Sequence, residues 1–207
     1  MVIPSINCSD FAAAASQIKK SEEFSEWIHI DVSDGKFTNV KSWGNPDELK
    51  SINTKQNIEV HLMVENPDEK ALLWLEAGVK RIIVHVQTIR DPRSLMSLAD
   101  NYSAEIMLAL DPSQSIENTH PYLKEFKLLQ VLTVFPGLSG QREQSGWAEK
   151  IKSLRELSPT ATIEVDGGMD PMDARIAKDA GADIIVSGSY IFSSPDPKGA
   201  YEELNSI

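Results

Sequence analysis

Short apolar runs alternate with longer amphipathic stretches along the whole chain. The runs are rich in Val and Ile and nearly continuous, which is typical of strands covered on both faces. They predict eight strands, at residues 2–6, 27–32, 58–64, 81–86, 105–110, 128–134, 162–166 and 183–188. The amphipathic stretches predict helices at 9–20, 46–53, 67–79, 91–102, 145–157, 171–182 and 198–206, while residues 113–126 have no clear pattern.

Proline, glycine and short polar residues mark the expected helix ends. Pro67 suits the first turn of one helix, and Gly78 suits its C-terminal end. Ser9 is the expected N-terminal cap of the first helix. The stretch 171–182 likewise runs from a proline to a glycine, so these helices have recognisable beginnings and ends.

Two α/β architectures have alternating strands and helices, the open doubly wound sheet and the closed barrel. The count of eight strands, and the absence of a GxGxxG motif after the first, favour a (β/α)8 TIM barrel. No linker or change of composition divides the chain. We therefore expect residues 1–207 to form one barrel domain, in which the chemistry lies at the carboxyl ends of the strands.

Charge and cysteine content narrow the possible partners. The formal net charge is −11, which argues against nucleic acid or an anionic membrane as a partner, because both require clustered Lys and Arg. A small anionic ligand remains possible, since backbone N–H groups hold phosphate without side-chain charge. The sequence shows no signal peptide or membrane span, and its single cysteine forms no intrachain disulfide, so a cytoplasmic location is expected.

Four polar residues lie at or near the ends of predicted strands. His29 and Asp31 are two residues apart, so both side chains project from the same face of a strand. His61 and Asp166 lie near the ends of two other strands. A single interior histidine is commonly a satisfied core residue, and a strand-end Asp often caps the next helix. The four together favour a site for one divalent metal ion, Zn²⁺, Fe²⁺, Mn²⁺ or Co²⁺, which would compensate both carboxylates.

Three glycine-rich segments follow the last three predicted strands. They are 136-PGLSGQ-141, 166-DGGM-169 and 188-GSYIF-192. Glycine lets backbone amides approach an oxyanion closely, and loops after strands seven and eight often bind phosphate in such barrels. One such loop is also what an ordinary turn requires. Three in succession indicate a phosphorylated ligand.

Three further polar residues are not expected to be ligands. His85 is expected to lie in the interior and to line the pocket, and His120 to lie on the surface. Asp34 is expected to be a loop residue beyond the strand that carries His29 and Asp31.

Seven segments resemble the ribulose-phosphate 3-epimerase family, in family order and with similar spacing over nearly the whole chain. The combination of HxD, HLM, PGxxGQ, VDGG and GS is highly specific. The segments are 3-IPSINCSDF-11, 29-HIDVSDGKF-37, 59-EVHLMVENP-67, 81-RIIVHVQT-88, 133-TVFPGLSGQ-141, 163-IEVDGGM-169 and 180-AGADIIVSGSYIF-192.

The resemblance implies a ribulose-phosphate-binding (β/α)8 barrel and an isomerase of the pentose phosphate pathway in carbohydrate metabolism. It implies that His29, Asp31, His61 and Asp166 bind the metal, and that Asp31 and Asp166 are the acid/base pair. One carboxylate would remove the C3 proton of a ketopentose 5-phosphate, and the other would deliver a proton to the opposite face. The metal would stabilise the intervening cis-enediolate as a Lewis acid.

The resemblance also implies a set of substrate contacts, and it leaves open an assembly of the chain into a homo-oligomer. Ser5 would contact substrate hydroxyls, and the glycine-rich segments would hold the phosphate. The expected substrate- and phosphate-binding residues are Ser5, His61, Met63, Gly137, Leu138, Ser139, Gly140, Gly167, Gly168, Gly188 and Ser189.

The chain departs from the family pattern at several positions. Ser33, Leu132 and Phe135 stand where the family usually has Met, Met and Asn, and Met63 is the pocket methionine that is clearly retained. Losing polarisable thioethers changes pocket shape and metal preference. Lys36 lies in an unusual loop and is expected to be solvated. No metal ligand is lost.

The leading hypothesis is a metal-dependent epimerase that converts D-ribulose 5-phosphate to D-xylulose 5-phosphate. A ketohexose 6-phosphate such as allulose 6-phosphate is the alternative substrate, with the same residues in the same roles. Related decarboxylases and aldolases are disfavoured, because their DxKxxD motif is absent and the segment from Asp31 reads DVSDGK. A non-catalytic phosphosugar-binding barrel would have no need of two opposed acids.

Overall fold

Eight parallel strands pair in chain order, and β1 also pairs with β8, so the sheet closes into a barrel. The computed structural model describes residues 1–138 and 140–207. The strands are β1 Val2–Ile6, β2 Trp27–Ser33, β3 Asn57–Met63, β4 Arg81–His85, β5 Glu105–Leu110, β6 Leu128–Leu132, β7 Thr162–Asp166 and β8 Ile184–Ser187. The predicted (β/α)8 fold is confirmed.

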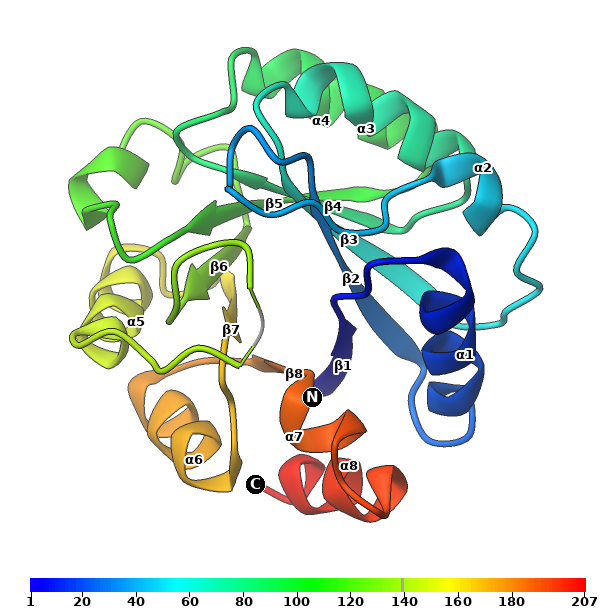
Figure 1. Ribbon diagram of the computed structural model, residues 1–207. Coiled ribbons are helices and arrows are strands. Elements are labelled where there is room, and N and C mark those ends of the chain that lie inside the picture. The colour runs from blue at the N-terminus through cyan, green and yellow to red at the C-terminus, as the bar shows by residue number, and fades with distance from the viewer. Residues whose placement is uncertain (139) are drawn as a thin grey trace.

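Helices surround the strands as an outer ring (Figure 1). They are α1 Phe11–Ser21, α2 Pro46–Leu49, α3 Pro67–Glu76, α4 Pro92–Asn101, α5 Trp147–Leu157, α6 Pro171–Ala180, α7 Ser189–Phe192 and α8 Pro197–Asn205, with a 3₁₀ helix, η1, at Ile116–Thr119. Among the described residues, no helix combines the length and the apolar character needed to cross a membrane.

A repeated local signal begins five of these helices. Each has proline in its first turn directly after an Asn or Asp, in the pairs Asn45–Pro46, Asn66–Pro67, Asp91–Pro92, Asp170–Pro171 and Asp196–Pro197. Proline is suited to this position because its fixed φ is helical and its missing N–H would be unpaired there. The expected role of Pro67 is confirmed.

Several predicted boundaries were wrong. Asp10, not Ser9, caps α1, since its carboxylate accepts a hydrogen bond from the backbone N–H of Ala13. α2 ends at Leu49, so most of the helix expected at 46–53 is absent, and residues 113–126 contain only the short η1. The short helix α7 was not predicted, because its residues read as part of a glycine-rich loop.

The apolar core divides into a large outer layer and two small inner clusters. The outer layer packs the strands against the helices, as Ile30, Val60 and Trp74 illustrate. Inside the barrel, buried apolar residues form two small clusters: one contains Ile83, Met107, Ala109 and Leu132, and the other contains Ile3, Ile184 and Val186. Polar and charged side chains occupy the interior between these clusters.

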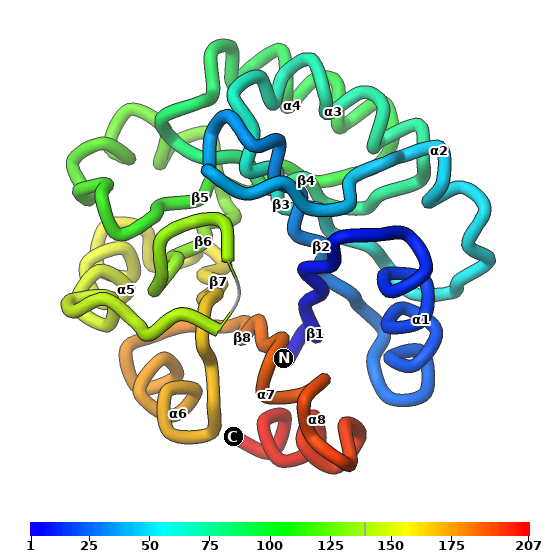
Figure 2. Tube along the Cα trace, viewed as in Figure 1, coloured from blue at the N-terminus to red at the C-terminus, as the bar shows by residue number. Residues whose placement is uncertain are grey.

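The connections after β2 and β6 meet above the barrel. Figure 2 traces both as they run beside the centre of the ring. A Cβ atom built on Gly137 would lie 3.4 Å from Thr38 Cβ, which places the two connections in contact. The side-chain amide of Asn7, just after β1, donates a hydrogen bond to the carbonyl of Gly137 at 2.9 Å. These contacts hold one wall of a cavity at the carboxyl end of the strands.

Candidate active and metal site

The four residues expected to bind a metal converge at the carboxyl end of the barrel. His29 and Asp31 lie on β2, and Asp31 is paired in register with His61 on β3. Asp166 ends β7. One ligand atom from each of these residues lies within 4.8 Å of the others. We call these four residues the carboxylate half of the site.

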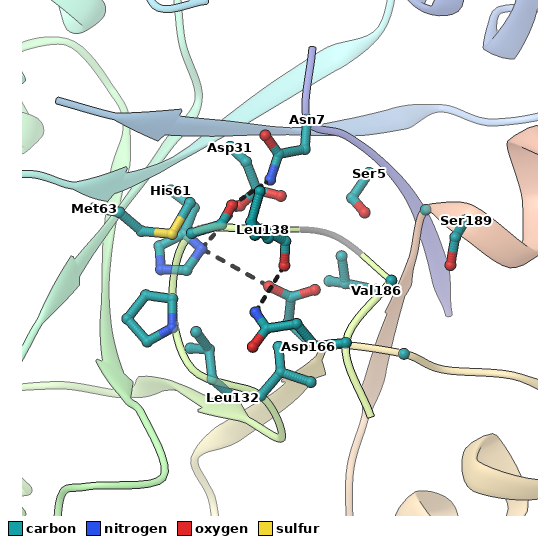
Figure 3. A pocket seen from close by; sticks show the side chains of 18 of the residues that line it. Ser5, Asn7, Asp31, His61, Met63, Leu132, Leu138, Asp166, Val186 and Ser189 are labelled. Carbon is teal, nitrogen blue, oxygen red and sulfur yellow. Dashed lines mark hydrogen bonds and ion pairs between the residues drawn. The ribbon is translucent and has the colours of Figure 1, made fainter. Parts of the chain in front are cut away.

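Short distances connect the imidazoles to the carboxylates. His61 Nδ1 lies 3.2 Å from Asp31 Oδ1 and 3.8 Å from Asp166 Oδ2. His29 Nε2 lies 3.4 Å and 3.9 Å from the same two oxygens. Both histidine side chains are fully buried, whereas each aspartate is 13% exposed. Figure 3 shows Asp31, His61 and Asp166 pointing toward one another.

The far side of each imidazole is already engaged. His29 Nδ1 donates a 2.8 Å hydrogen bond to Glu59 Oε1, and His61 Nε2 lies 2.9 Å from His85 Nε2. The remaining nitrogen of each ligand ring therefore faces the two carboxylates. Two imidazole nitrogens and two carboxylate oxygens, oriented from behind, form a donor set that suits a divalent transition metal. The residues present fit such an ion.

The two aspartates differ in acidity. Burial by itself raises the pKa of Asp31, but hydrogen bonds from His29 and His61 outweigh it and hold the pKa well below its ordinary value. Burial, and then the nearby charge of Asp31, raise the pKa of Asp166 to about 6. A pair of carboxyl groups whose pKa values are pushed apart is the usual arrangement of a base and an acid.

A cavity of about 250 Å³ opens directly above the carboxylate half. Every residue expected from the sequence to bind substrate or phosphate lines it, apart from Ser139, which lies outside the described residues. Asp31 and Asp166 also line it, while His29 is buried beneath. Figure 3 shows Ser5, Met63, Leu138 and Ser189 around the opening.

The opposite wall of the cavity is rich in glycine. Its glycines, which we call the glycine half, are Gly137, Gly140, Gly167, Gly168 and Gly188. The first four have positive φ angles, between 65° and 130°. A Cβ on Gly188 would lie 2.6 Å from Ser5 Oγ and 2.9 Å from the Ser5 carbonyl oxygen. No Lys or Arg lines the cavity in the described part of the chain, so an anion there would depend on backbone N–H groups and on neutral side-chain donors such as Ser189.

Predictions for the remaining polar residues can be compared with their positions. His85 is fully buried inside the barrel and is not among the residues that line the cavity, so its expected place in the pocket lining was wrong; burial lowers its pKa to about 4. The His120 residue is exposed, and the Lys36 side chain is 70% exposed, with its Nζ 3.9 Å from Glu65. Asp34 accepts hydrogen bonds from the backbone N–H groups of Lys36, Phe37 and Glu65, as a loop-organising residue does.

Of the three positions at which the chain departs from the family pattern, two lie in the wall of the cavity. Leu132 and Phe135 line it, and the Phe135 residue is 46% exposed. Ser33 is buried, and its hydroxyl donates to Met63 Sδ at 3.8 Å. Ser33 therefore contacts the retained methionine and does not itself reach the cavity.

Sequence reasoning missed the charged layer below the ligands. Glu59 precedes His61 by two residues and so projects from the same face of β3. This spacing could have identified Glu59 from the sequence as an interior residue close to the ligands. Its second oxygen accepts a 2.6 Å hydrogen bond from Arg81 Nη1. Cavity residues Asn7, Gln17 and Gln141 were missed as well, because no periodicity distinguishes them from ordinary loop and helix residues.

A sequence model of the ribulose-phosphate 3 epimerase family matches residues 1–192 of the chain. The chain belongs to this family. The predictions of the family and of an isomerase resembling ribulose-phosphate 3-epimerase are therefore confirmed.

Curated relatives agree along almost the whole chain. The ribulose-phosphate 3-epimerase of Chlamydia pneumoniae is 35% identical over 203 residues, covering 94% of this chain and 88% of that protein. The cytoplasmic isoform from Oryza sativa subsp. japonica is 33% identical, covering 95% and 89%. The Helicobacter pylori enzyme is 31% identical, covering 100% and 97%.

More distant solved structures share the fold. A 3-hexulose-6-phosphate synthase superimposes with a TM-score of 0.74 at 14% identity, covering 99% of this chain and 98% of that one. The orotidine 5'-phosphate decarboxylase of Pyrococcus horikoshii OT3 gives a TM-score of 0.67 at 19% identity, with both chains fully covered. At such identities the likeness is one of architecture, and it agrees with the eight-stranded barrel of this family member.

Proposed function

We propose that the protein is a metal-dependent 3-epimerase that interconverts D-ribulose 5-phosphate and D-xylulose 5-phosphate. The observation that carries this proposal is the carboxylate half itself. Two carboxylates and two imidazoles, with ligand atoms within 4.8 Å of one another, form the floor of a cavity whose opposite wall is glycine-rich backbone. Relatives that carry the name ribulose-phosphate 3-epimerase, at 31–35% identity, support the choice of substrate.

Asp31 and Asp166 are proposed as the acid/base pair. One carboxylate removes the proton at C3, and the other delivers a proton to the opposite face of the same carbon, which inverts its configuration. Their positions support this division, because both carboxylates line the cavity and reach it from different strands, Asp31 from β2 and Asp166 from β7. The first base in each direction is the group that is ionised when substrate binds.

His29, Asp31, His61 and Asp166 are proposed to hold one divalent ion. Such an ion, when bound, supplies Lewis-acid stabilisation of the negative charge that develops on the cis-enediolate. Neighbouring side chains orient the two imidazole ligands: Glu59 holds His29, and His85 holds His61. This leaves both carboxylates facing the cavity.

The other cavity residues are proposed to bind and orient the sugar phosphate. Ser5 contacts substrate hydroxyls, and Met63 and His61 pack beside the reacting carbons. The phosphate is proposed to lie against backbone amides of the glycine half, together with Leu138, Ser139 and Ser189. A homo-oligomer and a cytoplasmic location stay predictions.

A sugar-phosphate panel tests the proposal. We expect the purified protein to carry about one divalent ion per chain and to lose activity on complete chelation, because the ion is proposed to stabilise the enediolate charge. We also expect D-ribulose 5-phosphate to turn over faster than allulose 6-phosphate, measured by coupled assay for the pentulose and by NMR for the hexulose. Faster turnover of allulose 6-phosphate would change the substrate, and full activity in demonstrably metal-free protein would remove the metal.

A further inference from the structure

A continuous row of polar side chains crosses the interior of the barrel beneath the carboxylate half. His29, Glu59, Arg81 and Glu105 lie on four successive strands, β2 to β5, and each is the register partner of the next. Register partners in a parallel sheet project to the same face. The row therefore reaches from a proposed metal ligand to the opposite end of the barrel.

Each member of the row is hydrogen-bonded to its neighbour. His29 Nδ1 donates to Glu59 Oε1 at 2.8 Å, and Arg81 Nη1 donates to Glu59 Oε2 at 2.6 Å. On its other side, Arg81 donates from Nε and Nη2 to Glu105 Oε2, at 3.1 and 2.9 Å. The guanidinium carbon also lies 4.6 Å from the centroid of the Trp27 ring, a cation–π contact. Arg81 Nη1 lies 3.8 Å from Oε2 of the buried Glu164 as well, so the guanidinium faces three carboxylates and one aromatic ring.

Stability alone is a poor explanation for this row. Glu59 is fully buried and the Arg81 residue is 5% exposed, and such an ion pair costs nearly as much in desolvation as it returns in attraction. The same barrel fills the interior beside β1 and β8 with Ile3, Ile184 and Val186, so this sequence has apolar alternatives available to it. The desolvation cost of these buried charges therefore suggests that the row has a role other than stability.

The direction of the hydrogen bond between His29 and Glu59 suggests what the row does. A carboxylate has acceptor oxygens only, so Glu59 requires the proton of His29 on Nδ1 and leaves Nε2 free to bind a metal. Arg81 occupies the second oxygen of Glu59, which prevents the carboxylate from rotating away from the imidazole. We infer that Glu59 and Arg81 are positioning residues that fix the tautomer and orientation of His29 as a metal ligand. This inference rests on the proposed function.

Glu59→Gln tests the direction of the bond. Arg81 will take the amide oxygen of the new side chain, which turns the NH₂ group toward His29 Nδ1. Nδ1 must then accept a hydrogen bond, and the ring proton moves to Nε2, the atom that faces the carboxylates. We expect the affinity of metal-free protein for Co²⁺ to fall by about 10- to 100-fold, the usual effect of losing an outer-shell partner. Competition with a chromophoric chelator measures the affinity, and the visible spectrum of bound Co²⁺ reports the ligand geometry.

Arg81→Met is the second variant, and it decides the question if Glu59→Gln does not fold. It removes the group that immobilises Glu59, so we expect a weaker loss of Co²⁺ affinity in the same direction. Arg81→Lys keeps the charge with a single-point contact, and it should lie between Arg81→Met and the wild type.

Two controls separate positioning from general destabilisation. Glu105→Gln changes the outer end of the row, whose side chain is 52% exposed, and it leaves the Glu59 contact intact. Arg155→Met removes an arginine that bonds Gly181, Ala161 and Asp183 away from the site, so it should lower the melting temperature without changing Co²⁺ affinity.

The possible outcomes distinguish this inference from the proposed function. Wild-type protein that takes up no Co²⁺ overturns the metal-dependent function and this inference together. Wild-type protein that binds Co²⁺, with folded Glu59→Gln and Arg81→Met variants binding equally well, overturns the inference alone. Weakened binding in both variants with unchanged binding in both controls supports it.

Discussion

The two halves of the cavity are built in different ways. The carboxylate half consists of side chains on strands β2, β3 and β7, and the ladder of the barrel sets their positions. The glycine half consists of backbone in the connections after β6 and β7 and at the end of β8. Side chains on strands are held firmly enough for proton transfer at one carbon, whereas backbone with positive φ lets amides approach an anion.

This contrast predicts that changes in the two halves affect different kinetic parameters. A change in the carboxylate half removes a proton-transfer group, and kcat should fall. A change in the glycine half displaces the surface that holds the substrate, and KM should rise.

The largest effect is expected from Asp31→Asn and Asp166→Asn. Each change replaces a carboxylate by an amide of similar size, and we expect turnover to fall by about 10²- to 10⁴-fold because general acid–base catalysis is lost. Solvent deuterium exchange at C3 sharpens the test: each variant, once shown to hold the metal, should still exchange the C3 proton of one epimer only. Asp173→Asn, outside the ligand set, is the matched control. Near-normal turnover in either variant would remove that residue from the pair.

A smaller effect is expected from Gly167→Ala. Gly167 has φ of 112°, and a Cβ there would lie 2.7 Å from Thr133 Oγ1 and 2.8 Å from Val134 Cγ2. The loop must move, and we expect KM to rise by about tenfold, equivalent to 1.4 kcal/mol, with a smaller change in kcat. Steady-state kinetics measure the two parameters separately.

Gly78→Ala is the matched control for that variant. Gly78 also has a positive φ, 90°, but a Cβ there would meet nothing within 4 Å, and the residue follows α3 away from the cavity. In both variants the new side chain strains the backbone at a positive φ, which should cost about 1–3 kcal/mol of folding free energy. Both variants should therefore melt at a lower temperature than the wild type. Only Gly167→Ala should raise KM, and equal KM values would contradict the assigned role of the glycine half.

The smallest effect is expected from Asp173→Asn, which should change how the stability of the protein depends on pH. Burial, and then the charges of Glu143 and Asp170, raise the pKa of Asp173 to about 6. An unfolded aspartate has a pKa near 3.9, so between about pH 4 and pH 6 the folded state binds more protons and stability falls as pH rises. Asp173→Asn removes this loss, so the variant should melt at a higher temperature than wild type at pH 8.

The pH profile provides the check on Asp173. The difference in melting temperature should disappear near pH 4, where the wild-type carboxyl group is protonated as well. Because Asp173 is only partly buried, the gain is expected to be below about 1 kcal/mol. A constant difference at all pH values would indicate a cause other than titration.

Much of the fold could be predicted because its signals are local. Apolar runs located all eight strands, and a proline marked the start of helices such as α6 at Pro171. The cap of α1 was assigned to Ser9 instead of Asp10, since both residue types are good caps and only the hydrogen bond to Ala13 distinguishes them. The extent of α2 was overestimated because its end depends on packing.

In the candidate site, the four metal-ligand positions were predicted from the sequence, whereas Glu59 and Arg81 were not. His29, Asp31, His61 and Asp166 stood out as polar residues in or at the ends of buried strands. Glu59 is two residues from His61 and carried the same signal, but its role depends on Arg81, which begins another strand. A charged residue at a strand start commonly faces water, so its burial over Trp27 was not visible in the sequence.

The sequence by itself determined which residues share a strand face. Alternation in a β-strand places His29 beside Asp31 whatever the surrounding fold, and the run of Val and Ile around them makes that face internal. Only the tertiary structure decided which strands become neighbours. Closure of the barrel brought Asp166 to Asp31, and the register of β2 to β5 aligned His29 with Glu59 and Arg81. Register is set by packing across the whole sheet, which no local pattern encodes.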